Sequence, residues 1–261
     1  MKYLLLFALV FNGYLSDVYS QKTGRLIHSH NDYEQRVPFF QAYAQEVYSI
    51  EADVYYADGE LLVGHDKKDL RAERTLQAMY ITPIVNLFKQ NGGKAWLKSD
   101  KTFQVLIDLK TSTEPTLSAV VNLVKGYPEV FDFRTNPNAV KIVITGDVPS
   151  PADFDKYPEY IFFDGKTNTE YTPQQLKRVA LMSMPFFKYS QWKEEDVDVF
   201  GDEEKAKVQA EIDKAHALDK PIRFWASPDG EVAWSVLSEM GVDIINTDHI
   251  EVCAAFLRGR K

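Results

Sequence analysis

Short apolar segments alternate with amphipathic or polar segments along most of the chain. Segments such as 104–109 and 140–145 are nearly continuous runs rich in β-branched residues, which is typical of strands covered on both faces. We predict eight strands, at Leu26–His30, Ser49–Tyr56, Phe103–Lys110, Ala139–Thr145, Glu159–Asp164, Val179–Met184, Ile222–Ala226 and Asp243–Thr247. Helical segments are expected between and after them, at 38–47, 75–90, 115–125, 173–178, 203–218, 230–240 and 250–257, with a short segment at 151–157.

This order of elements predicts the fold. Eight strands, each followed by a helix or a connector, indicate an α/β protein with a single-domain (β/α)8 TIM barrel. The alternative is an open doubly wound sheet, which would need a glycine-rich turn after the first strand. The segment Ile27–His30 has no glycine, so we favour the barrel.

The first residues have a different character. Residues 3–11 are uninterruptedly apolar after Lys2, and small residues around Ser20 precede Gln21. This pattern predicts a signal peptide over residues 1–20 and a mature domain over 21–261, hence export to the periplasm or secretion. A buried first strand or helix is the alternative. The chain has no apolar run of about 18 residues, so we expect no integral membrane segment after cleavage.

Charge and cysteine content exclude some partners. The 38 Asp and Glu residues outnumber the 30 Lys and Arg residues, which gives a net charge of −8. A nucleic-acid-binding protein needs a basic surface, so nucleic acid is not an expected partner. The single cysteine, Cys253, cannot form an intramolecular disulfide, and we expect it to be a small buried residue.

Candidate reactive residues lie at the carboxyl ends of the first three strands, where TIM barrels carry their chemistry. They form three pairs two positions apart: His28 with His30, Glu51 with Asp53, and Asp108 with Lys110. Residues two apart point to the same face of a strand, here the barrel interior. Three converging carboxylates repel one another unless a cation lies among them. We therefore predict one divalent ion bound by Glu51, Asp53 and Asp108.

A predicted hairpin adds another histidine to this group. The Asp58-Gly59 turn follows the second strand and is flanked by strand-forming residues, which is typical of a two-residue hairpin. The returning chain is expected to bring His65 back to the barrel mouth. Asp66 could orient the imidazole or cap the segment that follows.

Several of these motifs resemble those of a known family. The segment 50–54, the Asp58-Gly59 turn and the segment 63–66 resemble the signature block of the glycerophosphodiester phosphodiesterases, within the phospholipase C-like phosphodiesterase superfamily. The segment 107–111 resembles the third-strand motif of the sphingomyelinase D enzymes. Segments 223–226 and 241–248 resemble the last two strands of the phosphodiesterases. The opening His28–Tyr33 resembles the branch that includes the altered-inheritance-of-mitochondria proteins.

The resemblance implies roles for the reactive residues. Glu51, Asp53 and Asp108 correspond to ligands of Mg²⁺ or Ca²⁺, and all-oxygen ligation agrees with either ion. A first-strand histidine and His65 correspond to an acid–base pair. Ser29-His30 replaces the usual Arg-Gly, which leaves open whether His28 or His30 is catalytic; we favour His28. The expected substrate contacts are His30, Asn31, the phosphate-binding Lys110 and the aromatic wall Trp225.

The middle of the chain contains one further candidate. The aromatic segment 185–189, together with Trp192, follows the sixth predicted strand. It fits a wall of the substrate pocket and core packing equally well.

The expected function is metal-dependent hydrolysis of a small-molecule or lipid-headgroup phosphodiester. One alternative is a metal-dependent amidohydrolase or phosphoesterase of the His-x-His barrel type, which needs more histidines on later strands than this chain with five histidines offers. Another alternative is a non-catalytic exported barrel that binds a ligand. Glycerophosphodiester, phosphoinositide, sphingophospholipid and nucleotide-like substrates all stay open.

Overall fold

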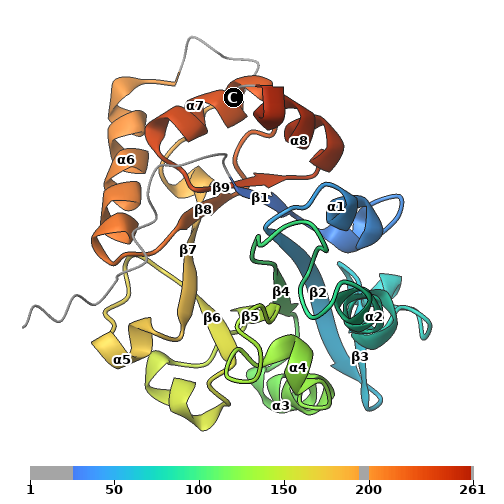
Figure 1. Ribbon diagram of the computed structural model, residues 1–261. Helices are drawn as coiled ribbons and strands as arrows, with labels where there is room; N and C mark the ends of the chain where they lie inside the picture. The colour runs from blue at the N-terminus through green and yellow to red at the C-terminus, as the bar shows by residue number, and fades with distance from the viewer. Residues whose placement is uncertain (1–25, 194–199, 260–261) are drawn as a thin grey trace, which may run out of the picture.

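The computed structural model describes residues 26–193 and 200–259. Eight parallel strands close into a barrel in the order β1-β2-β4-β5-β6-β7-β8-β9, and β9 pairs back with β1 (Figure 1). They are β1 Leu26–Ser29, β2 Ser49–Ala57, β4 Gln104–Leu109, β5 Lys141–Gly146, β6 Ile161–Gly165, β7 Val179–Pro185, β8 Ile222–Trp225 and β9 Ile244–Thr247. The predicted barrel is confirmed, and each of the eight predicted strands overlaps one of them, with ends that differ by at most two residues.

Helices surround the barrel (Figure 1). The α-helices are α1 Phe40–Ala44, α2 Thr82–Gln90, α3 Thr113–Val124, α4 Pro128–Phe131, α5 Pro173–Leu176, α6 Asp202–Ala217, α7 Glu231–Met240 and α8 Ile250–Gly259. Shorter turns are η1 Asp32–Glu34, η2 Lys67–Asp69, the π-helical η3 Gln77–Ile81, η4 Pro151–Lys156 and η5 Phe186–Lys188. Each predicted helical segment overlaps a helix or turn, whereas α4 was not predicted. The sequence signal is clear at α5, where Thr172 and Gln175 form a capping box.

The predicted hairpin is also present. Strand β3, Glu60–Val63, runs antiparallel to β2. Asp58 and Gly59 have φ angles of 52° and 83°, the left-handed conformations that a tight hairpin turn requires. The backbone N–H of Gly64 then donates to the carbonyl of Asp53 at 3.2 Å, so the chain returns to the end of β2 just before His65.

The barrel interior changes from apolar to polar along the strands. Near the amino ends it holds a separate apolar cluster of Tyr48, Leu106, Val143, Leu181 and Ile244. Two positions further along, the same strand faces carry the polar residues Asp108, Thr145, Ser183 and Asn246. The main hydrophobic core, which includes the buried Cys253, lies between strands and helices. The barrel interior therefore has an apolar layer near the amino ends of the strands and a polar layer at the mouth.

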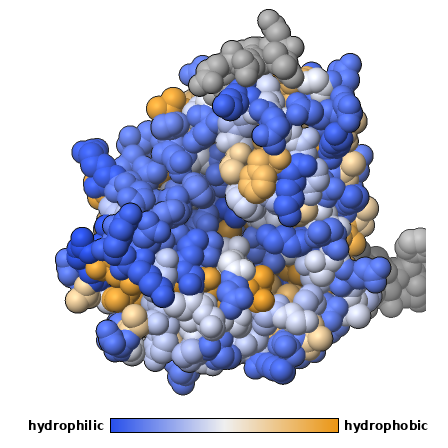
Figure 2. Space-filling view, turned by 180° about the vertical axis from the view of Figure 1, so that it is seen from behind, coloured by the Kyte–Doolittle hydropathy of each residue, from blue (hydrophilic) through white to orange (hydrophobic). Residues whose placement is uncertain are grey.

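The face shown in Figure 2 is mostly hydrophilic, with hydrophobic residues in small separate patches. Over residues 26–193 and 200–259, no helix combines the length and apolar character needed to cross a membrane. The predicted signal peptide, residues 1–20, lies outside the described residues. Cleavage and export thus stay predictions.

Candidate metal centre and active site

Three carboxylates meet at the mouth of the barrel. Asp53 on β2 pairs in register with Asp108 on β4, and Glu51 lies one layer below Asp53. One ligand atom from each residue lies within 4.8 Å of the others. Asp53 Oδ1 is buried without a hydrogen-bond partner, as expected of an oxygen placed to bind an ion. This all-oxygen set fits a single hard divalent cation, although ligation by these residues stays a prediction.

Gly146, at the end of β5, makes room for one of the carboxylates. Its φ of 76° is a conformation that favours glycine, and a Cβ atom here would overlap Asp108 Oδ1. Because Gly146 has no side chain, the Asp108 carboxylate can occupy this position.

Lys110 lies against two of the carboxylates. Its Nζ is 3.0 Å from Asp53 Oδ2 and 3.2 Å from Asp108 Oδ2. Burial raises the pKa of Asp108 to about 6 and also raises the pKa of Asp53, against the attraction of Lys110. Burial alone would lower the pKa of Lys110, but the two carboxylates outweigh it and raise that pKa. The raised pKa values show that the ionised carboxylates are disfavoured here, and a further positive charge nearby would stabilise them.

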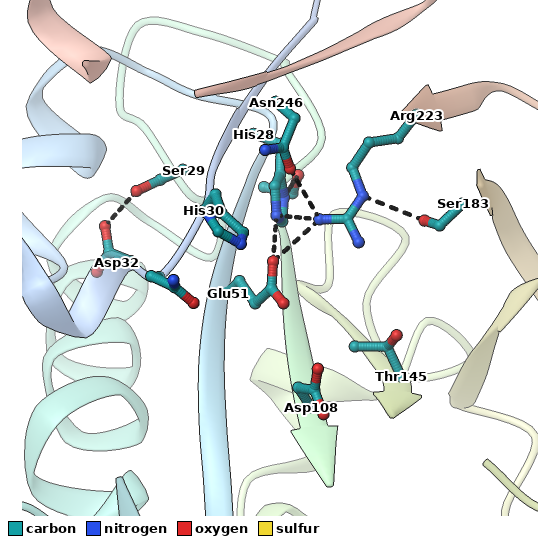
Figure 3. A network of polar contacts seen from close by, with 12 residues as sticks. His28, Ser29, His30, Asp32, Glu51, Asp108, Thr145, Ser183, Arg223 and Asn246 are labelled. Atoms are coloured by element: carbon teal, nitrogen blue, oxygen red, sulfur yellow. Dashed lines mark hydrogen bonds and ion pairs between the residues drawn. The ribbon is translucent and has the colours of Figure 1, made fainter. Parts of the chain in front are cut away.

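The structure argues against the expectation that His28 is the acid or base. His28 is completely buried, with Nδ1 2.7 Å from Ser49 Oγ and Nε2 2.8 Å from Glu51 Oε2. Nε2 also contacts the guanidinium of Arg223 (Figure 3). Burial and the charge of Arg223 lower the pKa of His28 to about 3, so the imidazole is neutral. Both ring nitrogens are engaged within the barrel, which leaves neither to exchange a proton with a substrate.

His30 has the accessibility that His28 lacks. Its side chain is 29% exposed, and its Nδ1 lies 2.8 Å from Asp248 Oδ1 at the end of β9. In Figure 3 it lies to one side of the network around His28. Burial would lower the pKa of His30, but the hydrogen bond to Asp248 and the charge of Glu51 raise it overall. Of the two first-strand histidines left open by the sequence, the geometry favours His30.

His65 lies on the other side of the carboxylates and is 60% exposed. Its Nδ1 is 3.2 Å from the hydroxyl of Tyr33 and 3.4 Å from Asp53 Oδ2. The single hydroxyl proton of Tyr33 goes to Asp53 Oδ2, the nearest acceptor at 2.8 Å. His65 Nδ1 must then carry the proton in its contact with these oxygens. In the neutral ring, Nε2 is left with a free lone pair.

Arg223 on β8 is a central residue that the sequence did not identify. Its Nη1 donates to Glu51 Oε2 at 3.0 Å and to Asn246 Oδ1 at 3.2 Å, and its Nε donates to Ser183 Oγ at 3.1 Å (Figure 3). Burial would raise the pKa of Glu51, but Arg223 and the hydrogen bond from His28 lower it below its usual range. The one available signal was an arginine inside an otherwise apolar strand segment.

Replacing Arg223 by methionine should destabilise the protein by about 3–5 kcal/mol, because Glu51 would be left as an unpaired buried charge. Chemical denaturation of the two proteins at neutral pH measures the difference. Arg258→Met is the matched control: Arg258 is exposed and donates to Gln45, and its loss should cost less than about 0.5 kcal/mol. Equal effects of the two substitutions would contradict a structural role for the Arg223–Glu51 pair.

The remaining predicted residues have varied surroundings. Asn31 Oδ1 lies 3.0 Å from the Tyr33 hydroxyl, next to the carboxylates. Trp225 is partly buried at the carboxyl end of β8. Asp66 forms a surface ion pair with Lys68 at 3.2 Å, in place of the expected orienting or capping contact.

Comparisons with known proteins agree with the fold. The AIM6-like phosphodiesterase domain matches residues 16–164. Altered inheritance of mitochondria protein 6 from Eremothecium gossypii is 27% identical in an alignment 267 positions long, which covers 88% of this chain and 69% of that protein. A glycerophosphodiester phosphodiesterase structure from Agrobacterium tumefaciens superimposes with a TM-score of 0.52 and 15% identity, over 88% of this chain and 99% of that one. A phosphodiesterase structure from Oleispira antarctica, in complex with the product sn-glycerol-3-phosphate, superimposes with a TM-score of 0.54 and 10% identity. The match covers 90% of this chain and 97% of that one.

Proposed function

This chain belongs to the family of AIM6-like phosphodiesterase domains, and from that premise we propose that it hydrolyses phosphodiesters with one bound Mg²⁺ or Ca²⁺ ion. One observation carries the proposal: Glu51, Asp53 and Asp108 converge at the barrel mouth, with the accessible His30 and His65 beside them. The product named for the Oleispira antarctica structure, sn-glycerol-3-phosphate, supports a small phosphodiester as the substrate.

The ligand chemistry supports a hard cation. An ion bound by Glu51, Asp53 and Asp108 would supply positive charge to the non-bridging oxygens of the phosphate. Among the described residues, the group that could hold a metal ion contains carboxylates and no histidine, which disfavours the zinc-type amidohydrolase alternative. Lys110 uses two of its three N–H donors on Asp53 and Asp108, and we assign the third to the phosphate.

We assign the two proton transfers from the hydrogen-bond partners of each histidine. His65 holds its Nδ1 proton toward Tyr33, so its Nε2 accepts the proton of the attacking water or substrate hydroxyl. His30 donates Nδ1–H to Asp248, and in its imidazolium form the Nε2–H protonates the leaving alkoxide. The bond from phosphorus to the attacking oxygen forms as the bond to the leaving oxygen breaks. Whether the attacker is water or a neighbouring hydroxyl decides between direct hydrolysis and a cyclic product.

The pH dependence of Asp248→Asn tests the acid role of His30. The imidazolium of His30 is the active form, and Asp248 raises its pKa, so activity should fall as pH rises through this pKa. Asparagine removes the negative charge, which lowers the pKa of His30 and moves the alkaline limb of the kcat profile to lower pH. An unchanged alkaline limb in Asp248→Asn would exclude His30 as the group that titrates there.

A hydrolysis screen tests the proposed function itself. Purified protein is assayed with glycerophosphodiesters, lysophospholipids, phosphoinositides and nucleotide diesters, with EDTA and with added Mg²⁺ or Ca²⁺. We expect turnover of at least one class, loss of turnover with EDTA, and recovery with one of the two ions. Tight binding without turnover across the panel would instead support a non-catalytic ligand-binding barrel. Recovery with Zn²⁺ alone would support the amidohydrolase-type alternative.

A further inference from the structure

The barrel mouth has two chemically different sides. The side formed by β1, β2 and β4 carries the carboxylates and Lys110, with His30 and His65 beside them. Strands β7 and β8 lie across the barrel from β2 and β4 (Figure 1). At their carboxyl ends they carry an aromatic pair, Phe187 and Trp225, with ring centroids 5.4 Å apart and planes at 79°.

The pair lies at the level of the mouth. Trp225 follows Arg223 by two positions on β8, so it points to the same interior face, one layer nearer the mouth than the Arg223–Glu51 contact. Pro185 at the end of β7 is in register with Trp225, and Phe187 follows Pro185 by two residues. The two rings therefore come from neighbouring strand ends that face the carboxylate cluster across the opening.

The exposure of Phe187 is fixed by its turn. Its neighbour Phe186 is buried and packs edge-on against Phe224, with centroids 6.1 Å apart. The carbonyl of Phe186 accepts the N–H groups of Tyr189 and Ser190 at 2.9 and 3.1 Å. Phe186 thus anchors η5, while Phe187 is held 48% exposed. Of the two alternatives for this aromatic segment, Phe186 and the buried Trp192 follow core packing, whereas the exposed Phe187 leaves the pocket-wall alternative open.

We propose that Phe187 and Trp225 bind the hydrocarbon part of a lipid phosphodiester whose phosphate lies at the carboxylate cluster. This inference rests on the proposed function and narrows its substrate class. A polar side and an apolar side across one opening match a molecule that has a phosphate next to a hydrocarbon chain. A cationic headgroup fits the aromatic pair less well, because the exposed Lys188 follows Phe187 directly.

The test compares substrates that share a headgroup and differ only in the chain. Glycerophosphocholine is compared with its hexanoyl and octanoyl lyso forms, all kept below their critical micelle concentrations. We expect kcat/KM to rise with chain length, by about tenfold from the compound without a chain to the octanoyl form. The rise should come mainly from a lower KM, because each buried CH₂ group contributes favourably to the free energy of binding. Phe187→Ser should reduce this chain-length advantage to about twofold. Phe133→Ser is the matched control, because Phe133 is a similarly exposed phenylalanine before β5, at the opposite end of the barrel.

The outcomes separate the inference from the function on which it rests. Turnover of glycerophosphocholine without a chain-length advantage would overturn the lipid inference and leave the phosphodiesterase proposal standing. A chain-length advantage that Phe187→Ser and Phe133→Ser retain equally would also overturn it. If no diester turns over, titration calorimetry in Mg²⁺ compares the binding of octyl phosphate with that of glycerol 3-phosphate. Tighter binding of octyl phosphate that is lost in Phe187→Ser would support the aromatic site. Equal binding of the two ligands would contradict it.

Discussion

Replacing His30 by glutamine is expected to lower kcat for phosphodiester hydrolysis by about 10²–10⁴-fold, the usual contribution of a positioned acid or base. Glutamine keeps a polar side chain near Asp248 but cannot deliver a proton to the leaving oxygen. Thermal unfolding should change little, since the ion pair that is lost is partly exposed and contributes about 1 kcal/mol at most. Steady-state kinetics and a melting curve of the same preparation measure both effects.

Two matched substitutions make this result specific. His249→Gln removes an exposed histidine one residue after Asp248 and should keep full activity. His28→Gln should lower the melting temperature, because it disturbs buried hydrogen bonds to Ser49 and Glu51. A His30→Gln protein with normal kcat would return the first-strand role to His28 or remove it from this strand altogether.

Replacing Asp53 by asparagine is expected to weaken Mg²⁺ or Ca²⁺ binding by at least about 100-fold and to lower kcat by about 10³-fold. The carboxylate supplies the buried Oδ1, and its charge helps to hold the ion that neutralises the phosphate. Asparagine has the same size and can still accept the hydroxyl hydrogen of Tyr33, so the fold should persist. Isothermal titration with the metal measures affinity separately from turnover.

Asp66→Asn is the control for this substitution. It removes the same unit of charge one residue from His65, but Asp66 is exposed and pairs with Lys68 on the surface. We expect metal affinity and kcat within about twofold of the wild type, since exposed ion pairs contribute little. Similar losses in both variants would mean that general charge at the mouth, and not direct ligation by Asp53, determines metal binding.

The fold was predictable because its signals are local. Segments such as 104–109 are continuous β-branched runs, and the Asp58-Gly59 turn needs φ values that few other residue pairs tolerate. The short helix α4, Pro128–Phe131, was missed because a single turn has too few residues to show a periodic pattern.

The site was predictable only in part. Residues two apart on one strand share a face, so Glu51 and Asp53 could be grouped, and Asp108 joined them through the carboxyl end of the next barrel strand. The same rule places both His28 and His30 on the interior face of the first predicted strand, but it does not predict which of the two histidines is buried. In the folded barrel, His28 is buried and contacts Arg223, which lies on a strand 195 positions later in the chain. No local pattern reports such a contact.

Anomalous diffraction from crystals grown with Mn²⁺, which takes the same oxygen ligands as Mg²⁺, tests the central claim most directly. One strong peak within bonding distance of Glu51, Asp53 and Asp108 oxygens is the expected result. A peak bound elsewhere, or no peak in this cluster at saturating Mn²⁺, would contradict a metal-dependent phosphodiesterase built on these three carboxylates.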